Sequence, residues 1–340
     1  MLVVLSQFPH GVPDLEKRTA QGRCELYIQT REEAETKPIP AAIRAKADAI
    51  VHYPAGTTIE GKTSDWPNVR AVLRSGVGYD MIDVAAWTKR NVAVFNVPDY
   101  GTSEVADHAI ALMLALTRGT SSYHDLIRAN PTANWHHLKA PVVRRLRGCT
   151  FGVVGLGRIG LAAALRARAF GMDIAFCDPF QPAGYEIAVG AKRVKTPAEL
   201  AAISDVLSIH APSAPETAGL IGKDVFAKAK KGLVLINTAR GAIVDLEALY
   251  DALKSKRVAA AGLDVLPEEP ANPNNRLVRA FLAREAWLEG RLTLSPHAAF
   301  YSPASLVDMR VSSLTNVLAH LETGSLAACV NAAQLKTKSK

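Results

Sequence analysis

A glycine-rich turn, Gly155-Leu-Gly157-Arg-Ile-Gly160, limits the folds open to this chain more than any other segment. The apolar residues 151–154 before it predict a buried strand, and the alanine-rich residues 158–170 after it predict a helix. Asp178 ends the next predicted strand, at about the 20-residue distance at which an acidic residue follows the turn in dinucleotide-binding βαβ units. The sequence therefore predicts a doubly wound α/β domain that binds a dinucleotide.

Each part of this motif has a physical role. The glycines let the backbone turn tightly and approach a pyrophosphate, and the free N–H groups at the start of the helix favour its negative charge. Asp178 would accept hydrogen bonds from both hydroxyls of the adenosine ribose. This carboxylate would repel a 2′-phosphate, and Pro179 and Phe180 after it supply no compensating arginine. The predicted cofactor is therefore NAD(H) rather than NADP(H).

The rest of the chain alternates β-rich runs with alanine-rich helical stretches, which is typical of α/β proteins with parallel sheets. Two such series follow one another, so we expect two similarly built α/β domains in the 340 residues. The predicted strands are 2–5, 49–53, 69–74 and 92–97, then 151–154, 173–177, 206–210, 233–237, 260–264 and 292–294. The predicted helices include 103–117, 158–170 and 197–203.

Composition narrows the possible partners. Apolar residues make up 49% of the chain, which excludes a disordered or fibrous protein, and the longest apolar run, 109–116, is too short to span a membrane. Forty Lys and Arg against 32 Asp and Glu give a net charge of +8, which suits anionic ligands. Basic clusters near residues 144–147, 228–231 and 336–340 lack interleaved aromatic residues, so we expect no nucleic-acid partner and no membrane association.

The cysteines and the N-terminus indicate the cellular compartment in which the protein is expected. The four cysteines lie far apart and form no CxxC pair, which is typical of free thiols in a reducing compartment. The first residues have no cationic segment and no small-residue cleavage site, so no signal peptide is expected. The predicted location is the cytoplasm. His136 and His137 are adjacent in a polar loop, and we expect no metal site.

Polar side chains follow several predicted strands of the second series. His210 ends one strand, Arg240 follows the next, Asp264 and Glu269 follow a third, and His297 follows the last. Because the carboxyl ends of parallel strands border the ligand crevice of a doubly wound sheet, we expect these groups to converge there. Each alone could be a loop ion pair or a helix cap, but together they indicate a catalytic site.

The sequence resembles the D-isomer-specific, NAD-dependent 2-hydroxyacid dehydrogenase family. Besides the glycine turn, the matching segments run in family order over nearly the whole chain: Gly76-Val-Gly-Tyr-Asp80, Asn96-Val-Pro98, Glu104-Val-Ala-Asp-His108, His210-Ala-Pro212 with Thr217, Asn237-Thr-Ala-Arg-Gly241, Gly262-Leu-Asp264, Glu269-Pro270 and Ser295-Pro-His297. Within the family, Pro296-His-Ala-Ala-Phe-Tyr-Ser302 and Cys329-Val-Asn331 are similar to the C-terminal-binding-protein branch.

The resemblance implies a hydride transfer between the cofactor and a small 2-keto or D-2-hydroxy acid. Arg240 would bind the substrate carboxylate and polarise the carbonyl. His297 would exchange the proton at the carbonyl oxygen. Glu269 would bond the other imidazole nitrogen, fix the tautomer and raise the pKa of His297, with Glu268 as the alternative carboxylate.

Other residues gain expected roles from the same resemblance. Asp264 would bond the nicotinamide carboxamide, and the N–H groups of Val77 and Gly78 would hold the substrate carboxylate, with Phe300 also in the substrate site. The C-terminal-binding-protein branch has Trp where this chain has Phe300, so that branch's preference for bulky keto acids need not hold here. The cofactor would be lined by Gly155, Gly157, Arg158, Ile159, Gly160, Asp178, His210, Ala211, Pro212, Thr217, Thr238, Ala239, Arg240, Asp264 and His297.

The family layout is discontinuous. It implies a substrate-binding domain formed by residues 1–98 plus 297–340, an NAD-binding Rossmann domain over 99–296, and an active-site cleft between them. It also implies a homodimer through the NAD-binding domain, with the helix at 103–117 packing across the two-fold axis. The stretch 271–291 is longer than in the resembling branch, and 277–289 predicts an extra helix that would cover the cleft or lie at an interface.

Two alternatives to a reductase stay open on the sequence. One is a dinucleotide-sensing scaffold like the corepressors of the resembling branch, for which catalysis is secondary and appended interaction segments are expected. The other is formate dehydrogenase, which is disfavoured because that relative pairs its histidine with Gln instead of Glu. The intact set of Arg240, Glu269 and His297 favours chemistry, whereas the identity of the keto acid is not readable.

Overall fold

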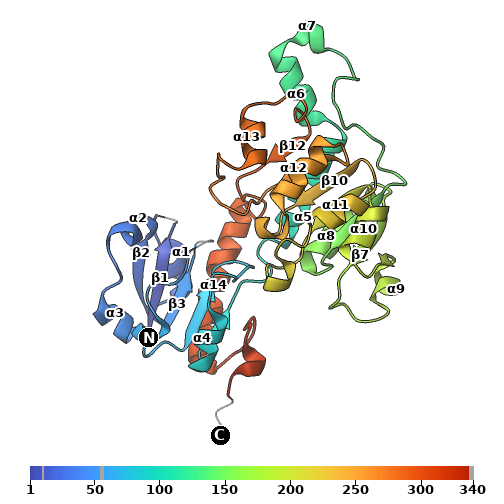
Figure 1. Cartoon of the computed structure of the whole chain (residues 1–340). Coiled ribbons are helices and arrows are strands. Elements are labelled where there is room, and N and C mark those ends of the chain that lie inside the picture. Colours follow the sequence, from blue (N-terminus) through green and yellow to red (C-terminus); the bar gives the residue numbers. More distant parts are fainter. Residues whose placement is uncertain (10, 54–56, 337–340) are drawn as a thin grey trace. The chain divides into compact units, whose positions relative to one another are not determined.

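The computed structural model describes residues 1–9, 11–53 and 57–336. The chain divides into two compact units, which we call unit 1 (Met1–Gly101 with Ser302–Lys340) and unit 2 (Thr102–Tyr301) (Figure 1). The joints expected near residues 98 and 296 lie at 101 and 301 in this division. Lys338 and Lys340 of the predicted basic tail lie outside the described residues.

Unit 1 is built on a five-stranded parallel sheet with the order β2-β1-β3-β4-β5. Its strands are β1 (Leu2–Phe8), β2 (Glu25–Thr30), β3 (Ala49–His52), β4 (Ala71–Arg74) and β5 (Ala93–Phe95). Its helices are α1 (Asp14–Ala20), α2 (Arg31–Thr36), α3 (Ala41–Lys46), η1 (Thr63–Asp65), α4 (Val84–Lys89), α14 (Pro303–Thr323) and η4 (Ala332–Gln334). Buried apolar clusters lie on both faces of the sheet, as parallel strands require.

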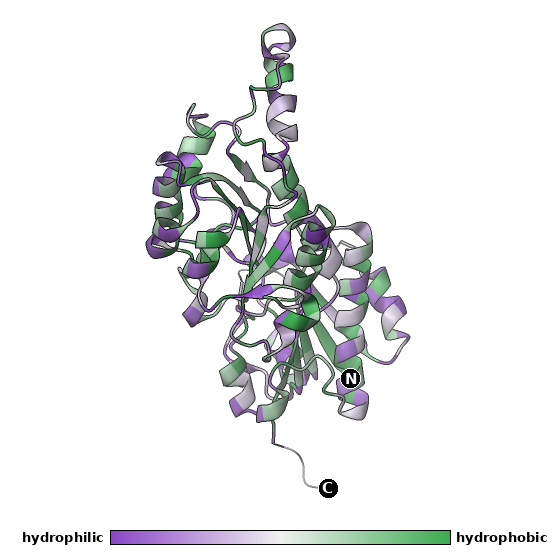
Figure 2. Cartoon of the chain, turned by 90° about the vertical axis from the view of Figure 1, so that its right-hand side faces the viewer, coloured by the Kyte–Doolittle hydropathy of each residue, from purple (hydrophilic) through white to green (hydrophobic). Residues whose placement is uncertain are grey.

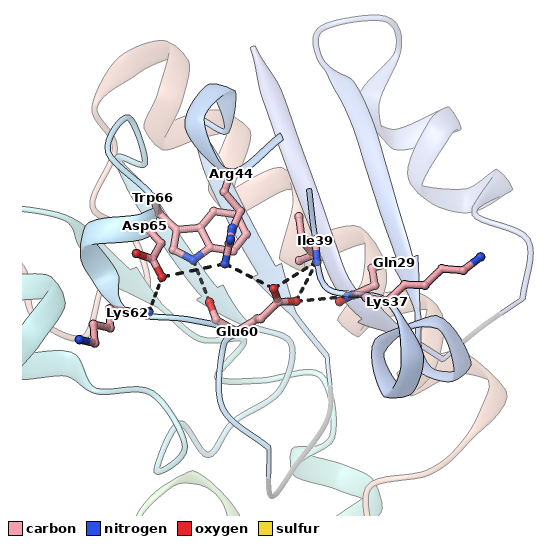
Figure 3. A network of polar contacts seen from close by, with 8 residues as sticks. All are labelled: Gln29, Lys37, Ile39, Arg44, Glu60, Lys62, Asp65 and Trp66. Carbon is pink, nitrogen blue, oxygen red and sulfur yellow. Dashed lines mark hydrogen bonds and ion pairs between the residues drawn. The ribbon is translucent and has the colours of Figure 1, made fainter. Parts of the chain in front are cut away.

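Within its described residues, the connection from β3 to β4 contains one short helix, η1, and a partly buried polar network holds it (Figure 3). The Glu60 carboxylate accepts hydrogen bonds from Ile39 N at 2.9 Å, from Arg44 Nη1 at 3.4 Å and from Gln29 Nε2 at 3.4 Å. Trp66, which is fully buried, donates its indole N–H to Glu60 O at 2.9 Å. These bonds tie the connection to β2, α3 and the segment between α2 and α3.

Unit 2 is a seven-stranded parallel sheet with the order β12-β11-β10-β9-β6-β7-β8. The strands are β6 (Thr150–Val154), β7 (Asp173–Cys177), β8 (Lys192–Arg193), β9 (Val206–Ile209), β10 (Leu233–Asn237), β11 (Val258–Leu263) and β12 (Leu292–Leu294). The order reverses at β6, whose neighbours are β7 and β9. A ligand crevice is expected at such a switch point, outside the carboxyl ends of these strands. The two parallel-sheet α/β domains predicted from the sequence are confirmed.

Helices cover both faces of this sheet. The helices of unit 2 are α5 (Thr102–Thr117), α6 (Thr120–Ala129), α7 (Pro131–Asn134), α8 (Arg158–Ala169), α9 (Tyr185–Val189), α10 (Pro197–Ile203), η2 (Pro215–Thr217), α11 (Lys223–Lys228), η3 (Gly241–Ile243), α12 (Leu246–Lys254) and α13 (Arg276–Leu282). Figure 2 shows hydrophobic residues concentrated on the strands and hydrophilic residues along the outer sides of the helices. No helix in the described part of the chain is long and apolar enough to cross a membrane.

Packing inside unit 2 explains the apolar composition of helix α5. Ala106, Ala109, Leu112, Met113 and Leu116 are buried in the cluster that α5 shares with α8 and the sheet. An apolar helix is expected to be buried between layers or between subunits. Because this burial occurs within one chain, the composition of α5 no longer argues for a two-fold axis along it.

The predicted helix over 277–289 is too long. The observed helix α13 ends at Leu282, and the rest of the segment is irregular. The Arg276 guanidinium lies 3.9 Å from the centroid of the Tyr250 ring of α12, and Trp287 meets the same ring edge-on at 5.3 Å. Buried Arg291 donates to three backbone carbonyls of α12 and β11 and to Trp287 O of its own segment. The extra segment is therefore fastened to α12 within unit 2.

Candidate active site

The glycine turn brings the ends of β6 and β9 together. Gly155 has φ of +88°, a conformation that favours glycine, and its N–H donates to Cys177 O at 3.0 Å. A Cβ on Gly155 would lie 2.7 Å from Ala211 N and 2.9 Å from His210 C, so a side chain cannot fit there. At Gly157, just before α8, no described atom lies within 4 Å of a Cβ position. That space borders the free N–H groups at the start of α8, where an anion binds well.

The Asp178 carboxylate lies beside this turn. Its Oδ2 accepts a hydrogen bond from Leu156 N at 2.8 Å, and its Oδ1 accepts one from Phe180 N at 2.9 Å. The nearby Arg193 donates to three backbone carbonyls of residues 178–182 and to the Glu186 carboxylate at 2.9 Å. The arginine next to Asp178 is therefore engaged in holding the turn that carries it.

Two buried polar atoms near the switch point lack a hydrogen-bond partner within the described residues. They are His210 Nδ1, after β9, and Thr238 Oγ1, after β10. Burial lowers the pKa of His210 to about 4, so its imidazole is neutral near pH 7, and its Nε2 lies 2.8 Å from Ser208 Oγ. Unpaired buried polar groups are costly unless a ligand completes them. Together with the open space at Gly157, they fit the hydroxyl and amide groups of a dinucleotide.

His297 and Glu269 form a close pair. His297 Nδ1 lies 2.6 Å from Glu269 Oε2, and Glu269 Oε1 accepts Leu266 N at 3.1 Å. Burial opposes ionisation of Glu269, but the hydrogen bond and charge of His297, the Leu266 N–H and the charge of Arg240 together hold the pKa of Glu269 below its usual range. The ionised carboxylate therefore occupies Nδ1 and leaves Nε2 as the nitrogen that can exchange a proton. The alternative, Glu268, accepts from Asn272 Nδ2 at 2.8 Å instead.

Arg240 is brought to this pair by close packing of two loops. Asn237 at the end of β10 braces the Arg240 loop, donating Nδ2 to Arg240 O at 3.0 Å and accepting Ala239 N at 3.0 Å. A Cβ on Gly241 would lie 1.9 Å from the carbonyl carbon of Leu266, so only glycine lets the Arg240 loop touch the chain that leads to Glu269. Arg240, Glu269 and His297 are thus neighbours at the carboxyl ends of β10, β11 and β12.

The Asp264 carboxylate makes contacts within the chain that the sequence did not predict. Its side chain is fully buried, and its carboxylate accepts Ser295 Oγ at 2.6 Å and the backbone N–H groups of Ala298 and Ala299, each at 2.9 Å. The bond from Asp264 to the nicotinamide carboxamide stays a prediction; within the chain, the carboxylate holds the turn that carries His297. Ser295 was overlooked as a functional residue, although it lies in the quoted segment Ser295-Pro-His297.

The remaining predicted residues divide between the two units. In unit 2, Phe300 meets the His297 ring at 80° with the centroids 6.3 Å apart, and Thr217 Oγ1 accepts Ala214 N at 2.8 Å within its own loop. Arg158 and Ile159 begin α8, while Ala211 and Pro212 follow β9. The structure describes no group of three His, Cys, Asp or Glu side chains that could hold a metal ion.

In unit 1, Val77 and Gly78 follow β4. Val77 O accepts Asn96 Nδ2 at 2.7 Å, which fixes this loop against the end of β5. Sequence analysis overlooked Arg74, which is only 8% exposed at the end of β4 and donates Nη1 to Ser75 O at 2.8 Å. The burial of this arginine could not be foreseen from the sequence.

A family model agrees with this geometry. Residues 110–299 match the model described as D-isomer specific 2-hydroxyacid dehydrogenase, NAD binding domain. The match covers most of unit 2, including the glycine turn, Asp178, Arg240, Glu269 and His297.

Individual proteins are similar over longer ranges. A D-3-phosphoglycerate dehydrogenase from Archaeoglobus fulgidus is 39% identical over 266 residues, which are 78% of this chain and 47% of that protein. A glyoxylate reductase from Korarchaeum cryptofilum is 37% identical over 74% of this chain and 73% of its own. An NADPH-dependent glyoxylate/hydroxypyruvate reductase from Sinorhizobium meliloti, solved with NADP and malonate, is 30% identical with a TM-score of 0.80 over 99% of both chains. The chain thus spans about half the length of the phosphoglycerate dehydrogenase.

Proposed function

This chain belongs to the D-isomer specific 2-hydroxyacid dehydrogenase family, and we propose that it is an NAD(H)-dependent enzyme that interconverts a small 2-keto acid and a D-2-hydroxy acid. One observation carries the proposal: His297 Nδ1 lies 2.6 Å from Glu269 Oε2, with Arg240 beside them at the carboxyl edge of a dinucleotide-binding sheet. A structural ion pair would not need an arginine at the same place. A proton donor next to a carboxylate-binding group is what a keto acid requires.

Each residue of the set has a defined task in reduction. When bound, NADH supplies the hydride that reaches the carbonyl carbon of the keto acid. Arg240 binds the carboxylate through its planar guanidinium and polarises the carbonyl. His297 donates the proton from Nε2 to the carbonyl oxygen, and Glu269 stabilises the ring and fixes its orientation. The product is the hydroxy acid, and oxidation runs the same steps in reverse.

The reaction is tested with purified protein, NADH and a panel of small 2-keto acids, among them glyoxylate, hydroxypyruvate and pyruvate. We expect at least one to be reduced, as seen by loss of NADH absorbance, and its product to be the D isomer where the product is chiral. Tight NADH binding without turnover of any keto acid would instead favour the scaffold hypothesis. Use of the L isomer in the reverse reaction would contradict the proposal directly.

Asp178 leads us to propose NADH as the preferred cofactor, in contrast to the Sinorhizobium reductase. Its carboxylate would bond two ribose hydroxyls, and charged hydrogen bonds contribute about 1.5–3 kcal/mol each. We therefore predict that kcat/KM with NADH exceeds that with NADPH at least about tenfold, since about 1.4 kcal/mol corresponds to that factor. The measurement is steady-state kinetics with both cofactors at a fixed keto acid concentration.

The variant Asp178→Ser removes the charge that would repel a 2′-phosphate. Its preference for NADH over NADPH should shrink mainly because NADH binds less well. Glu186→Gln, which changes a carboxylate on α9 bonded to Arg193 of β8, is the matched control and should keep the preference. Equal use of both cofactors by the unmodified protein would show that Asp178 does not decide the choice.

Glu269 should control the pH dependence of reduction. The reaction needs the protonated His297 ring, so the rate falls as the pH rises. The pKa of Glu269 lies below its usual range, so its negative charge is present near neutrality and favours the protonated ring. In Glu269→Gln this charge is gone, so the alkaline limb of the rate profile should move to lower pH, by one unit for each roughly 1.4 kcal/mol of lost interaction.

Glu268→Gln is the matched control for this experiment, because Glu268 is bonded to Asn272 and not to His297. Its pH–rate profile should coincide with that of the unmodified protein. A shift in Glu268→Gln with none in Glu269→Gln would mean that the carboxylate was assigned wrongly.

We also propose a homodimer formed by unit 2. The helices α6 and α7 project from the rest of the unit (Figure 1), and Trp135 and Leu138 after them are 78% and 75% exposed. A groove of about 670 Å³ near the end of α5 is lined by Leu114, Val143 and Phe170 together with four arginines. Exposed apolar side chains on one unit suit an isologous interface with a second copy.

Light scattering at micromolar concentration should therefore give the mass of two chains. The double variant Trp135→Ser/Leu138→Ser removes apolar area and should shift the equilibrium toward the monomer. A monomer mass for the unmodified protein at that concentration would refute the proposal.

A cytoplasmic location is proposed on the state of the thiols. Cys24, Cys149, Cys177 and Cys329 are all free. Burial is the main cause that raises the pKa of each thiol, to about 11 for Cys177, which keeps the thiols protonated and unreactive.

A further inference from the structure

Most hydrogen bonds that hold the backbone around His297 end on Asp264. His297 has φ of +53°, in the left-handed region that residues other than glycine rarely adopt. Its N–H donates to Asp264 O at 2.8 Å, and the next two N–H groups, of Ala298 and Ala299, donate to the two oxygens of the Asp264 carboxylate at 2.9 Å. Three successive N–H groups thus end on Asp264, and its position determines where the His297 ring lies.

The hydroxyl of Ser295, which precedes His297 in the sequence, bonds to the same carboxylate. Ser295 Oγ donates to Asp264 Oδ1 at 2.6 Å, a short bond of the kind expected between a hydroxyl and a carboxylate. Ser295 N also donates to Leu263 O at 3.0 Å, at the end of β11. The turn is therefore closed on Asp264 at residue 295 as well as at residues 298 and 299.

His108 on α5 completes the chain of donors. Its Nε2 lies 2.8 Å from Ser295 Oγ and 3.5 Å from Asp264 Oδ1. A serine hydroxyl has one proton, and Ser295 donates it to Asp264, so Ser295 Oγ must accept from His108. Nε2 of His108 therefore carries a proton, and the bonds run in one direction from His108 to Ser295 to Asp264.

We propose that His108 and Ser295 are positioning residues for His297, which act through the Asp264 carboxylate. Neither residue touches the reacting atoms. Without the Ser295 hydroxyl, the turn loses its anchor before His297, and the ring can leave the geometry in which Nε2 faces the substrate. The inference rests on the proposed function, because its main readout is the reduction of a keto acid.

The experiment compares five variants with the unmodified protein: Ser295→Ala, His108→Ala, the double variant of these two, and the conservative variants Ser295→Thr and His108→Gln. Small displacements of a reacting group cost large factors in rate, so kcat should fall about tenfold in Ser295→Ala, with KM and the Kd for NADH nearly unchanged. His108→Ala should lower kcat by a similar or smaller factor.

Two comparisons separate positioning from a general loss of stability. If His108 acts through Ser295, the double variant should be no slower than Ser295→Ala, because coupled residues are not additive. His108→Gln keeps an N–H donor near the place of Nε2 and should recover most of kcat, as should Ser295→Thr, which keeps the hydroxyl. Ser255→Ala removes an exposed hydroxyl from the end of α12 in the same unit and is the matched control.

The outcomes are distinguishable. Additive losses, or His108→Gln as slow as His108→Ala, would overturn the inference while leaving the proposed function intact, as would an unchanged kcat in Ser295→Ala.

Inactivity of the unmodified protein would instead refute the proposed function. In that case nitrogen NMR of labelled histidines still tests the inference, since the His297 resonance, identified by its loss in His297→Asn, must shift in Ser295→Ala and stay in place in Ser255→Ala. If Ser295→Ala fails to fold, the His108→Ala and His108→Gln pair decides.

Discussion

Replacing His297 by Ala should lower kcat for keto acid reduction by about 10²–10⁴-fold, the range that general acid catalysis provides. The ring is the proposed proton donor, and its partner Glu269, bonded at 2.6 Å, is ionised and cannot replace it. NADH binding should be preserved, because the proposed cofactor contacts lie chiefly at the glycine turn and Asp178. The measurements are steady-state kcat and the Kd for NADH from fluorescence.

The left-handed backbone at His297 calls for a second variant. Alanine at φ of +53° adds backbone strain, whereas asparagine tolerates this conformation and still lacks the proton donor. His297→Asn should therefore lose as much kcat as His297→Ala. His124→Ala, which changes an exposed histidine on α6, should leave kcat unchanged. Near-normal kcat in both His297 variants would refute the assignment of His297 as the proton donor and support the scaffold hypothesis.

Replacing Arg240 by Lys should lower kcat/KM about 10- to 100-fold, as expected for the loss of a charged bidentate interaction of about 1.5–3 kcal/mol. Lysine keeps the charge but cannot bind a carboxylate with two parallel hydrogen bonds. Because Arg240 is proposed to act on the substrate both before and during hydride transfer, KM should rise and kcat should fall together.

The control for this variant is Arg279→Lys, which changes an exposed arginine on α13 of the same unit. It should behave like the unmodified protein in both KM and kcat. A rise in KM alone for Arg240→Lys would mean that Arg240 binds the carboxylate without polarising the carbonyl. No change in either would place the substrate carboxylate elsewhere.

The parts of the fold that were predicted well carry strong local signals. The strands β7, β10 and β12 and the helix α10 have the bounds predicted, because each is an apolar run or a periodic segment between clear turn residues. The strand β2 was not predicted, since Glu25–Thr30 mixes polar and apolar residues as an edge strand does. The end of α13 was misplaced because Arg284 has φ of +52° where a glycine would have marked the stop.

In the candidate site, too, the residues with a local sequence signal were predicted and those joined only by packing were not. Arg240, Glu269 and His297 could be found because each follows a strand whose end borders the crevice. The network of His108, Ser295 and Asp264 joins α5 to the ends of β11 and β12, residues that are far apart in the sequence. Only the packing of α5 on this edge of the sheet brings them together, so no local pattern could reveal the network.

The helix that completes unit 1 is synthesised after the whole of unit 2. Leu314, Val317 and Leu318 of α14 are fully buried in the cluster that also contains Val3 and Leu5 of β1. Until this helix leaves the ribosome, one face of the five-stranded sheet is uncovered, whereas unit 2, continuous over 102–301, already has all its residues. Folding during translation is therefore expected to complete unit 2 before unit 1, the reverse of the usual order, with the N-terminal strands incompletely covered until α14 packs on them.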